Sequence, residues 1–385
     1  MNAGVSRLPI PETPDGLTPE WLTAALTESG ALTGEQVIAA RWERVGEEYG
    51  FTGVVVRVEL RYDRERGDLP ASLIAKLPMA QGDTVSGYRA LQERDPALMR
   101  RYYERCAREE RFYREVGARC APELFYSAAD DAQTRVVLLL QDLSGGRQGD
   151  VLQGCSIDEA ALVIDELAPF HARWWGERAP TSGFASLWRH PGEWQERYER
   201  QVEVFLERFG DRAPPALCAV ASLLRSRLAD VAEALFGRPR ALTHGDLHLD
   251  NLLFDARGAR SVVVLDWQST SFGAPAWDVA YFLCDSLSAD DRRAAEADLL
   301  ERYVMLLAEH GVTDYSLEDL RHEISLALLA QLAGTVGWLT RLDAAELTDR
   351  ERALQEGVLG DGRLAAALLD HDVEAVLAGP IPRSP

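Results

Sequence analysis

The hydrophobic pattern divides the chain into a first part with several strands and a second part made of helices. Residues 17–30 (LTPEWLTAALTESG) have apolar positions at helical spacing between a threonine–proline start and a glycine stop, which predicts a capped helix. Residues 51–62 (FTGVVVRVELRY) and 71–78 (ASLIAKLP) are rich in β-branched residues and are separated by a turn-rich stretch, which predicts two strands.

The remaining pattern completes a mixed layout. A stretch without glycine before Gly117 predicts a long helix over 95–120, and RVVLLLQDL (135–143) predicts a short buried strand. Further helices are expected at 157–178, 193–209, 215–237 and 290–378, with a second short strand at 259–268. We therefore expect an α+β fold with a small β-rich lobe at 1–140, a polar hinge at 141–149 and a larger helical lobe at 150–385.

One apolar stretch resembles a membrane span in composition. Residues 324–340 (ISLALLAQLAGTVGWLT) carry no charge, but the run is short for a span and contains Gln331, Gly334 and Gly337. A buried helix is the better interpretation, so we expect no membrane span.

Composition and charge restrict the classes of partner. The sequence has 41 Lys and Arg against 62 Asp and Glu, so its formal net charge is −21. An acidic chain is poorly suited to general binding of nucleic acid, so no nucleic-acid partner is expected. The five cysteines are scattered without a CxxC pair, and the N-terminal residues lack an apolar signal segment. A cytoplasmic location is therefore expected.

Polar residues are concentrated in LTHGDLHLDNLLFD (242–255), which lies between apolar runs. Asp246 and Asn251 are five residues apart, and Asp266 ends the strand-like run SVVVL further along the chain. Phosphoryl transfer needs a carboxylate that accepts a hydroxyl proton, and it needs amide and carboxylate oxygens that hold Mg²⁺ against the nucleotide phosphates. These residue types fit that chemistry.

These residues also carry a resemblance to a known family. HGDLHLDN followed by LDWQ resembles the paired motif of aminoglycoside phosphotransferases and choline kinases, which share a two-lobed protein-kinase-like fold. LAPFHARWW and FLCD are similar to the ecdysteroid-kinase-like branch of the same superfamily. The resemblance covers nearly the whole chain, and it implies an ATP-dependent, Mg²⁺-dependent kinase of small molecules.

The resemblance also implies roles for individual residues of the motif. Asp246 would be the catalytic base, and Asn251 and Asp266 would be Mg²⁺ ligands. His244 would brace the loop, and Asp278 in GAPAWDVAYFL would be the structural aspartate that fixes it.

The nucleotide would be bound by residues of the first part. Lys76, alone on an apolar strand, matches the lysine that holds the α- and β-phosphates. Its helix partner would be Glu109 or Glu110, and the spacing to the FY pair favours Glu109. The hinge backbone from Gln141 to Leu143 would bind adenine.

The phosphate loop departs from the protein-kinase pattern. No GxGxxG is present, and VGEEYGFTG offers Gly46, Gly50 and Gly53 at a different spacing. We assign Gly50 and Gly53 to the nucleotide on position alone.

The sequence is less consistent with several other interpretations. His244 and His248 could suggest a metal pair, but the glycine between them disfavours the helix that such a pair needs. A protein kinase would need a long activation segment, and only eleven residues (267–277) separate Asp266 from Asp278. A pseudokinase that only binds nucleotide would be expected to lack a metal ligand, and a metal-dependent hydrolase would not need Lys76.

The acceptor is expected to be a hydroxylated small molecule bound in the helical lobe beside Asp246. The acidic charge, the lobe's tryptophans and the downstream carboxylates of Asp285, Asp290 and Asp291 favour a cation such as an aminoglycoside or an amino alcohol. The competing interpretation is a neutral alcohol in an apolar pocket, with the acidic residues facing water.

Overall fold

The structure is a computed structural model that describes part of the chain in two compact units. It describes residues 8–45, 54–64, 66–77, 96–176, 183–185, 188, 190–237, 240–341, 347–360 and 362–381, with the backbone alone at 96–99. Unit 1 comprises Met1–Gly146 and Val263–Gln268, and unit 2 comprises Arg147–Val262 and Ser269–Pro385. The sequence analysis placed residues 263–268 in the helical part, whereas the structure groups them with unit 1. The hinge at 141–149 stays a prediction.

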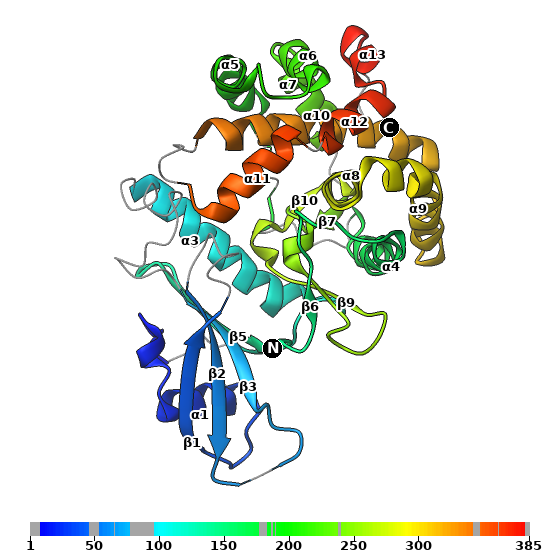
Figure 1. Ribbon diagram of the computed structural model, residues 1–385. Helices are drawn as coiled ribbons and strands as arrows, with labels where there is room; N and C mark the ends of the chain where they lie inside the picture. Colours follow the sequence, from blue (N-terminus) through cyan, green and yellow to red (C-terminus); the bar gives the residue numbers. More distant parts are fainter. Residues whose placement is uncertain are drawn as a thin grey trace. The chain divides into compact units, whose positions relative to one another are not determined.

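Unit 1 is built around a five-stranded antiparallel sheet of order β1-β2-β3-β5-β4. Its elements are η1 (Pro14–Gly16), α1 (Pro19–Glu28), β1 (Val37–Arg44), β2 (Val54–Tyr62), β3 (Ser72–Leu77), α3 (Pro96–Arg111), the π-helical turn η2 (Phe112–Val116), β4 (Leu124–Asp130) and β5 (Arg135–Gln141). Figure 1 shows β1, β2 and β3 side by side.

The alternation of side chains in the sheet decides which face carries chemistry. In β3, Leu73, Ala75 and Leu77 are buried in the cluster that also holds Trp21 and other apolar residues of α1. Because successive residues of a strand point to opposite faces, Lys76 lies on the other face of the sheet. Lys76 is therefore kept out of the apolar cluster that β3 forms with α1.

Two strands of the unit 1 sheet were not predicted from the sequence. β1 is an edge strand whose residues are mostly exposed or half-buried, so its apolar alternation is weak, and β4 has a register shift after Leu124. The predicted helix at 215–237 is also two helices, α6 (Pro215–Leu224) and α7 (Leu228–Phe236). At the break, the Arg227 guanidinium donates to the carbonyl oxygens of Leu377 and Gly379, which are distant in sequence.

Unit 2 is mainly helical and carries short strands around the polar motif. Its other elements are β6 (Arg147–Gln148), α4 (Ile157–Arg173), α5 (Pro191–Phe209), β7 (Ala241–Thr243), η4 (Leu249–Asn251), β8 (Leu252–Phe254), β10 (Ser271–Gly273), α8 (Pro275–Ser286), α9 (Ala289–Glu309), α10 (Leu317–Arg341), α11 (Asp349–Gly360), α12 (Arg363–Asp370) and α13 (Val373–Ala378). Strand β9 (Val262–Val264) leads from this unit into unit 1, and η5 (Trp267–Ser269) leads back.

Helix α10 is the central helix of unit 2. It packs against α8, α5 and α7, and Figure 1 shows it running between α8 and the group formed by α5, α6 and α7. By length and composition it could cross a membrane, but 78% of its most apolar window is buried inside the structure. Its apolar residues therefore form core, as expected of a buried helix.

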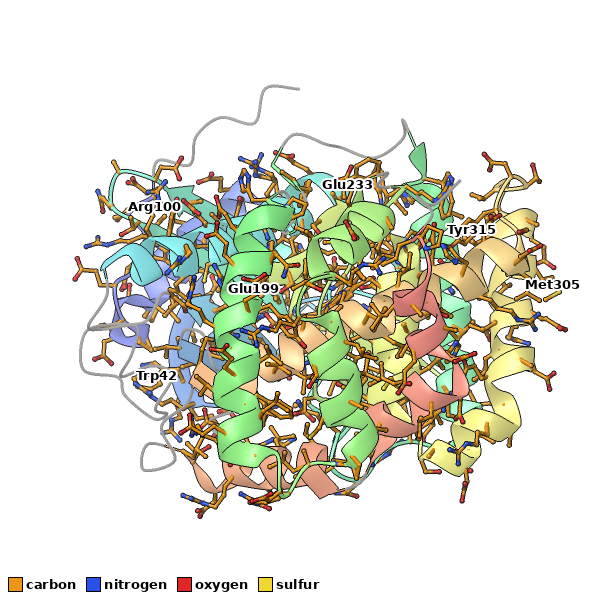
Figure 2. All side chains as sticks on the ribbon, turned by 90° about the horizontal axis from the view of Figure 1, so that it is seen from above. Trp42, Arg100, Glu199, Glu233, Met305 and Tyr315 are labelled. Atoms are coloured by element: carbon orange, nitrogen blue, oxygen red, sulfur yellow. The ribbon has the colours of Figure 1, made fainter. Side chains whose placement is uncertain are left out.

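Helix α5, which packs against α10, is amphipathic. In α5 the buried positions Tyr198, Val202, Phe205 and Phe209 recur at helical spacing. Figure 2 shows Glu199 of α5, which is exposed, and it shows Met305 of α9 at the periphery of its helix, where half of its surface is accessible. The solvent-facing side of α5 thus carries charged residues such as Glu199, whereas that of α9 also carries the apolar Met305.

Candidate active site

The polar motif forms a loop that buried leucines hold in place. It follows β7 and includes η4, and Leu247, Leu249 and Leu252 are fully buried. Asp246, which precedes Leu247, and Asn251, which precedes Leu252, are half-buried. The alternation of apolar and polar residues in the sequence therefore anchors the loop and leaves its polar groups at the surface of unit 2.

Gly245 lets the loop make a turn that other residues resist. Its φ is +84°, in the left-handed region, and a Cβ built there would overlap the carbonyl oxygen of Ser269. The Trp277 indole Nε1 donates to the Gly245 carbonyl oxygen at 3.1 Å. The position preceding Asp246 is thus fixed from both sides.

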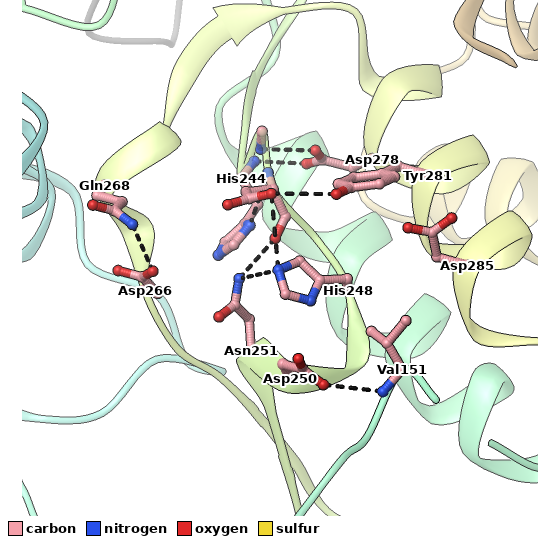
Figure 3. A network of polar contacts seen from close by, with 12 residues as sticks. Val151, His244, His248, Asp250, Asn251, Asp266, Gln268, Asp278, Tyr281 and Asp285 are labelled. Atoms are coloured by element: carbon pink, nitrogen blue, oxygen red, sulfur yellow. Dashed lines mark hydrogen bonds and ion pairs between the residues drawn. The ribbon is translucent and has the colours of Figure 1, made fainter. Parts of the chain in front are cut away.

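A buried carboxylate holds the start of this loop. Asp278, on the first turn of α8, accepts hydrogen bonds from the backbone N–H groups of His244 at 2.6 Å and Gly245 at 2.8 Å (Figure 3). It also lies 3.2 Å from Nε2 of the buried His171, whose Nδ1 lies 2.7 Å from the Tyr303 hydroxyl. A buried carboxylate needs such hydrogen-bond partners. Because two of them are backbone N–H groups of the loop, Asp278 fixes the position of His244 and Gly245.

Asp246 and Asn251 are brought together inside unit 2. The Asn251 side-chain Nδ2 donates to the Asp246 backbone oxygen at 2.9 Å and lies 3.1 Å from Nε2 of His248. This orientation leaves the Asn251 carbonyl oxygen as the atom that can face a cation. The Asp246 carboxylate is 31% exposed and accepts a long hydrogen bond of 3.5 Å from the Tyr281 hydroxyl. It is therefore open to a further partner.

Tyr281 was not predicted from the sequence. Burial, reinforced by the charge of Asp246, raises the pKa of the Tyr281 hydroxyl well above its ordinary value. The side chain therefore stays protonated and can act as a donor to Asp246. Its spacing of three residues after Asp278 places both on one side of α8, a signal that could have identified it.

Unit 1 holds the second group of predicted site residues. The Lys76 Nζ lies 2.6 Å from Oε1 of Glu109 on α3 and 3.3 Å from Oδ1 of Asp266. Burial alone would lower the pKa of Lys76, but the two carboxylates outweigh it and raise the pKa above its ordinary value. Lys76 is therefore a fixed positive charge with two acidic neighbours.

Asp266 has an unusual backbone conformation. Its φ is +60°, which residues other than glycine seldom adopt, and such outliers occur most often at functional sites. The Gln268 Nε2 donates to its Oδ2 at 2.7 Å, and the neighbouring Trp267 stacks on Phe112 with 4.0 Å between ring centroids. The backbone N–H of Val264 donates to the Cys120 carbonyl oxygen, which further ties this segment to unit 1.

The structure separates the two candidate helix carboxylates. Glu109 faces Lys76, whereas Glu110 accepts hydrogen bonds of 2.9 Å each from Arg114 and from the Ser127 hydroxyl. Burial raises the pKa of Glu109, and Lys76 opposes that shift. Glu109 is thus the partner of the lysine, and Glu110 joins α3 to the sheet.

Of the other residues assigned to the nucleotide, the structure describes Gln141 and Leu143 but not the glycines. The backbone N–H of Gln141 donates to the Glu123 carbonyl oxygen at 2.8 Å, so the sheet already uses that donor. Leu143 follows in the segment after β5 and is buried, and its carbonyl oxygen accepts from Gly146. Gly46, Gly50 and Gly53 lie outside the described residues.

A cavity of about 220 Å³ lies in unit 2 next to the motif. Its wall includes Gly245 and the aromatic residues Trp188, Trp194, Phe236 and Trp277. The three aspartates predicted for the acceptor site are not among the described residues that line this cavity, and the charge of the acceptor stays a prediction. Asp285 accepts from Gln331, Asp290 lies near Arg293, and Asp291 caps α9 with Ser288.

An arginine on α11 contacts the motif and was not predicted from the sequence. The Arg350 guanidinium of α11 donates to Asp250 at 2.7 Å and to Asp150 at 3.2 Å. Asp250, which precedes Asn251, also accepts from the Val151 backbone N–H at 3.0 Å. No local sequence signal indicates this contact, because its partners are 100 residues or more apart.

Comparison with known proteins places this geometry in context. The model of the phosphotransferase enzyme family (APH) matches residues 64–315, which is more than half of the chain. A crystal structure from Ralstonia eutropha, a candidate aminoglycoside phosphotransferase, has a TM-score of 0.52 at 14% identity and covers 91% of this chain and 97% of its own. Choline kinase from Cryptosporidium parvum has a TM-score of 0.50 at 11% identity, with 88% and 94% covered. These likenesses show the protein-kinase-like fold.

Curated relatives match over shorter segments. Acyl-CoA dehydrogenase family member 11 from Gallus gallus is 27% identical over 145 residues, which are 35% of this chain and 17% of that protein. The Mus musculus protein of the same name is 30% identical over 86 residues, which are 22% of this chain and 10% of that protein. The matched segments are therefore a small part of much longer proteins.

Proposed function

Because the chain belongs to the phosphotransferase enzyme family, we propose that it transfers the γ-phosphate of ATP to a hydroxyl group of a small molecule with the aid of Mg²⁺. One observation carries the proposal. Asp246 is a partly exposed carboxylate on a loop that Asp278 holds rigidly through two backbone N–H groups. A positioned but accessible carboxylate is what a hydroxyl acceptor requires of a base.

We assign the proton transfer to Asp246. Its carboxylate accepts the proton of the acceptor hydroxyl while that oxygen forms a bond to the γ-phosphorus, and the bond from phosphorus to the bridging oxygen breaks to release ADP. The Tyr281 hydroxyl, 3.5 Å from Asp246 Oδ1, orients the carboxylate. Asp278 and His171 act through the loop and touch no reactant.

Asn251 and Asp266 are the residues we assign to Mg²⁺. The cation prefers oxygen ligands, and the Asn251 amide is turned so that its nitrogen is used inside the loop. Asp266 offers carboxylate oxygens next to Lys76. When bound, the cation would neutralise charge on the phosphates during transfer.

The nucleotide assignments rest on unit 1. Lys76, held by Glu109, would pair with the α- and β-phosphates. Because the sheet uses the N–H of Gln141, we assign Leu143 as the hinge residue whose N–H binds adenine. The dehydrogenase name of the curated relatives is not carried over, since the match covers at most 17% of the two described above.

The competing functions are less well supported. Residues 267–277 are taken up by η5, β10 and the start of α8, which leaves little chain for the activation segment of a protein kinase. A pseudokinase would bind nucleotide without turnover, yet Asp246, Asn251 and Asp266 are all present.

The test is the substitution Asp246→Asn, which keeps the shape of the side chain and removes its basicity. We expect acceptor-dependent ADP formation to fall about 10²–10⁴-fold, while ATP binding by calorimetry and the thermal midpoint stay near the parent values. The matched control is Asp314→Asn, an exposed aspartate in unit 2. Near-normal turnover in Asp246→Asn would refute the mechanism, and ATP binding without turnover in the parent protein would favour the pseudokinase.

A further inference from the structure

The cavity beside the motif is walled by stacked aromatic rings. Trp188 stacks on Trp194 with 4.5 Å between ring centroids and on Phe236 with 4.8 Å, and it meets Trp277 edge-on at 5.9 Å. Trp188, Trp194 and Trp277 are each only half-buried. Large aromatic rings that stay partly exposed around a hollow favour an apolar ligand body, because a ligand would remove that surface from water.

The charges on this wall are positive. Arg197 and Arg341 line the cavity, and no carboxylate is among its described lining residues. The guanidinium carbon of Arg197 lies 4.9 Å from the centre of the Trp194 ring. A guanidinium that stacks by its face keeps the N–H donors at its edge available, and their fork matches the two oxygens of a carboxylate. A cationic ligand would meet repulsion at the same place.

The cavity also adjoins the proposed base. Gly245, the residue before Asp246, forms part of its wall, and the lining residue Trp277 donates to the Gly245 carbonyl oxygen. Trp277 lies 5.7 Å from the ring of Tyr281, whose hydroxyl reaches Asp246. A molecule in the cavity would therefore contact the loop at the residue before the proposed base, although Asp246 itself is not among the described lining residues.

We propose that the acceptor is a hydroxylated carboxylic acid with an apolar body, bound in this cavity with its carboxylate on Arg197. The inference rests on the proposed phosphotransfer and names its substrate class. It replaces the expectation of a cationic acceptor, because the tryptophans line the cavity whereas the aspartates expected beside them do not. The net charge of −21 is a sum over the whole chain, whereas the charged residues among the described lining of this cavity are arginines.

Binding is measured first, without nucleotide. The probes are hydroxylated phenylalkyl and medium-chain carboxylates, each compared with its primary amide and its primary amine. Titration is followed by tryptophan fluorescence, since the wall holds three tryptophans. We expect the carboxylates to bind about tenfold more tightly than the amides, as one charge-assisted pair provides, and the amines to bind most weakly. Equal or tighter binding of the amines, or no binding of any carboxylate, would overturn the inference.

Variants then locate the anion. Arg197→Gln should remove the about tenfold preference for carboxylate over amide, while amide binding stays unchanged. Arg200→Gln is the matched control, because Arg200 is exposed on the same helix, as Arg197 is, but does not line the cavity. Retained carboxylate preference in Arg197→Gln would refute the role of this residue.

The same compounds, tested for ADP formation with ATP and Mg²⁺, separate the two proposals. Selective binding of carboxylates without any turnover would refute phosphotransfer and leave the ligand class standing. Turnover that favours amines or amides over carboxylates would refute the ligand class and leave phosphotransfer standing.

Discussion

Among single residues, Glu109 and Glu110 show how neighbours in sequence acquire different roles. Both are buried, but Glu109 lies 2.6 Å from Lys76, and Glu110 serves Arg114 and Ser127. Successive residues of a helix point about 100° apart, so only one of the two can face the lysine. The sequence favoured Glu109 through its spacing to Phe112 and Tyr113, and the contact in the structure is with Glu109.

This difference gives a prediction with a built-in control. Glu109→Gln should raise the KM for ATP about tenfold, because it removes a charge-assisted hydrogen bond that holds Lys76 for the phosphates. Glu110→Gln should leave that KM near its parent value and lower the thermal midpoint instead. Steady-state kinetics over a range of ATP concentrations measures both. A larger KM effect in Glu110→Gln would show that the wrong carboxylate was chosen.

Gly245 occupies a backbone position of the motif that only glycine fits without strain. A glycine is required there because φ is +84° and a Cβ would overlap the Ser269 oxygen. The motif letters alone indicate a glycine between His244 and Asp246, but the clash is with a residue from a distant part of the chain. The reason for the glycine is therefore tertiary.

Among the elements, α11 contacts the loop that carries Asp246 and Asn251, although it lies far from the motif in sequence. Arg350 joins the helix to Asp250 and Asp150, and its side chain is 14% exposed. Burial opposes the charge of Arg350, but its hydrogen bonds with the two aspartates raise its pKa above the ordinary value. Because Asp250 precedes Asn251 in the loop, we expect Arg350 to act as a positioning residue for the Asn251 amide.

We predict that Arg350→Leu lowers kcat and raises the Mg²⁺ concentration needed for half-maximal activity, each about tenfold. Arg350→Lys should recover part of the loss, since a lysine keeps the charge without the planar fork. Arg352→Leu on the exposed side of the same helix is the control. A fall in thermal stability with unchanged Mg²⁺ dependence would mean that α11 stabilises the fold and does not position Asn251.

For the molecule as a whole, the two units divide the proposed work. Lys76, Glu109 and Asp266 belong to unit 1, and Asp246, Asn251 and Arg197 belong to unit 2. Lys76 and Arg197 share no partner among the described residues, so changes at the two positions should act independently.

We therefore predict additive effects on ligand binding. Lys76→Ala should weaken binding of a non-hydrolysable ATP analogue and leave binding of a hydroxylated carboxylate unchanged, and Arg197→Gln should do the reverse. In the double variant, the two losses of binding free energy should add to within about 0.5 kcal/mol. Calorimetric titration of the four proteins gives the comparison. A large coupling energy would show that nucleotide and acceptor are bound through a common element.

The sequence by itself determined the α+β class, the helical second part and the residues of the motif. These are encoded locally: the period of apolar residues sets helix or strand, and the leucines between Asp246 and Asn251 separate fully buried from half-buried positions. The resemblance of HGDLHLDN and LDWQ to a phosphotransferase motif added the family. The roles of Gly50 and Gly53 stay predictions, since they lie outside the described residues.

Only the tertiary structure decided which side chains meet. It groups residues 263–268 with the strand-rich unit, divides the helix predicted at 215–237 into two and brings Arg350 to Asp250 of the motif loop. It also placed arginines, where carboxylates were expected, beside the tryptophans of the cavity. Net charge and composition are sums over the chain, whereas the charge of a cavity depends on the few residues that packing turns toward it. We therefore base the proposed acceptor class on the residues that line the cavity and not on the number of acidic residues in the chain.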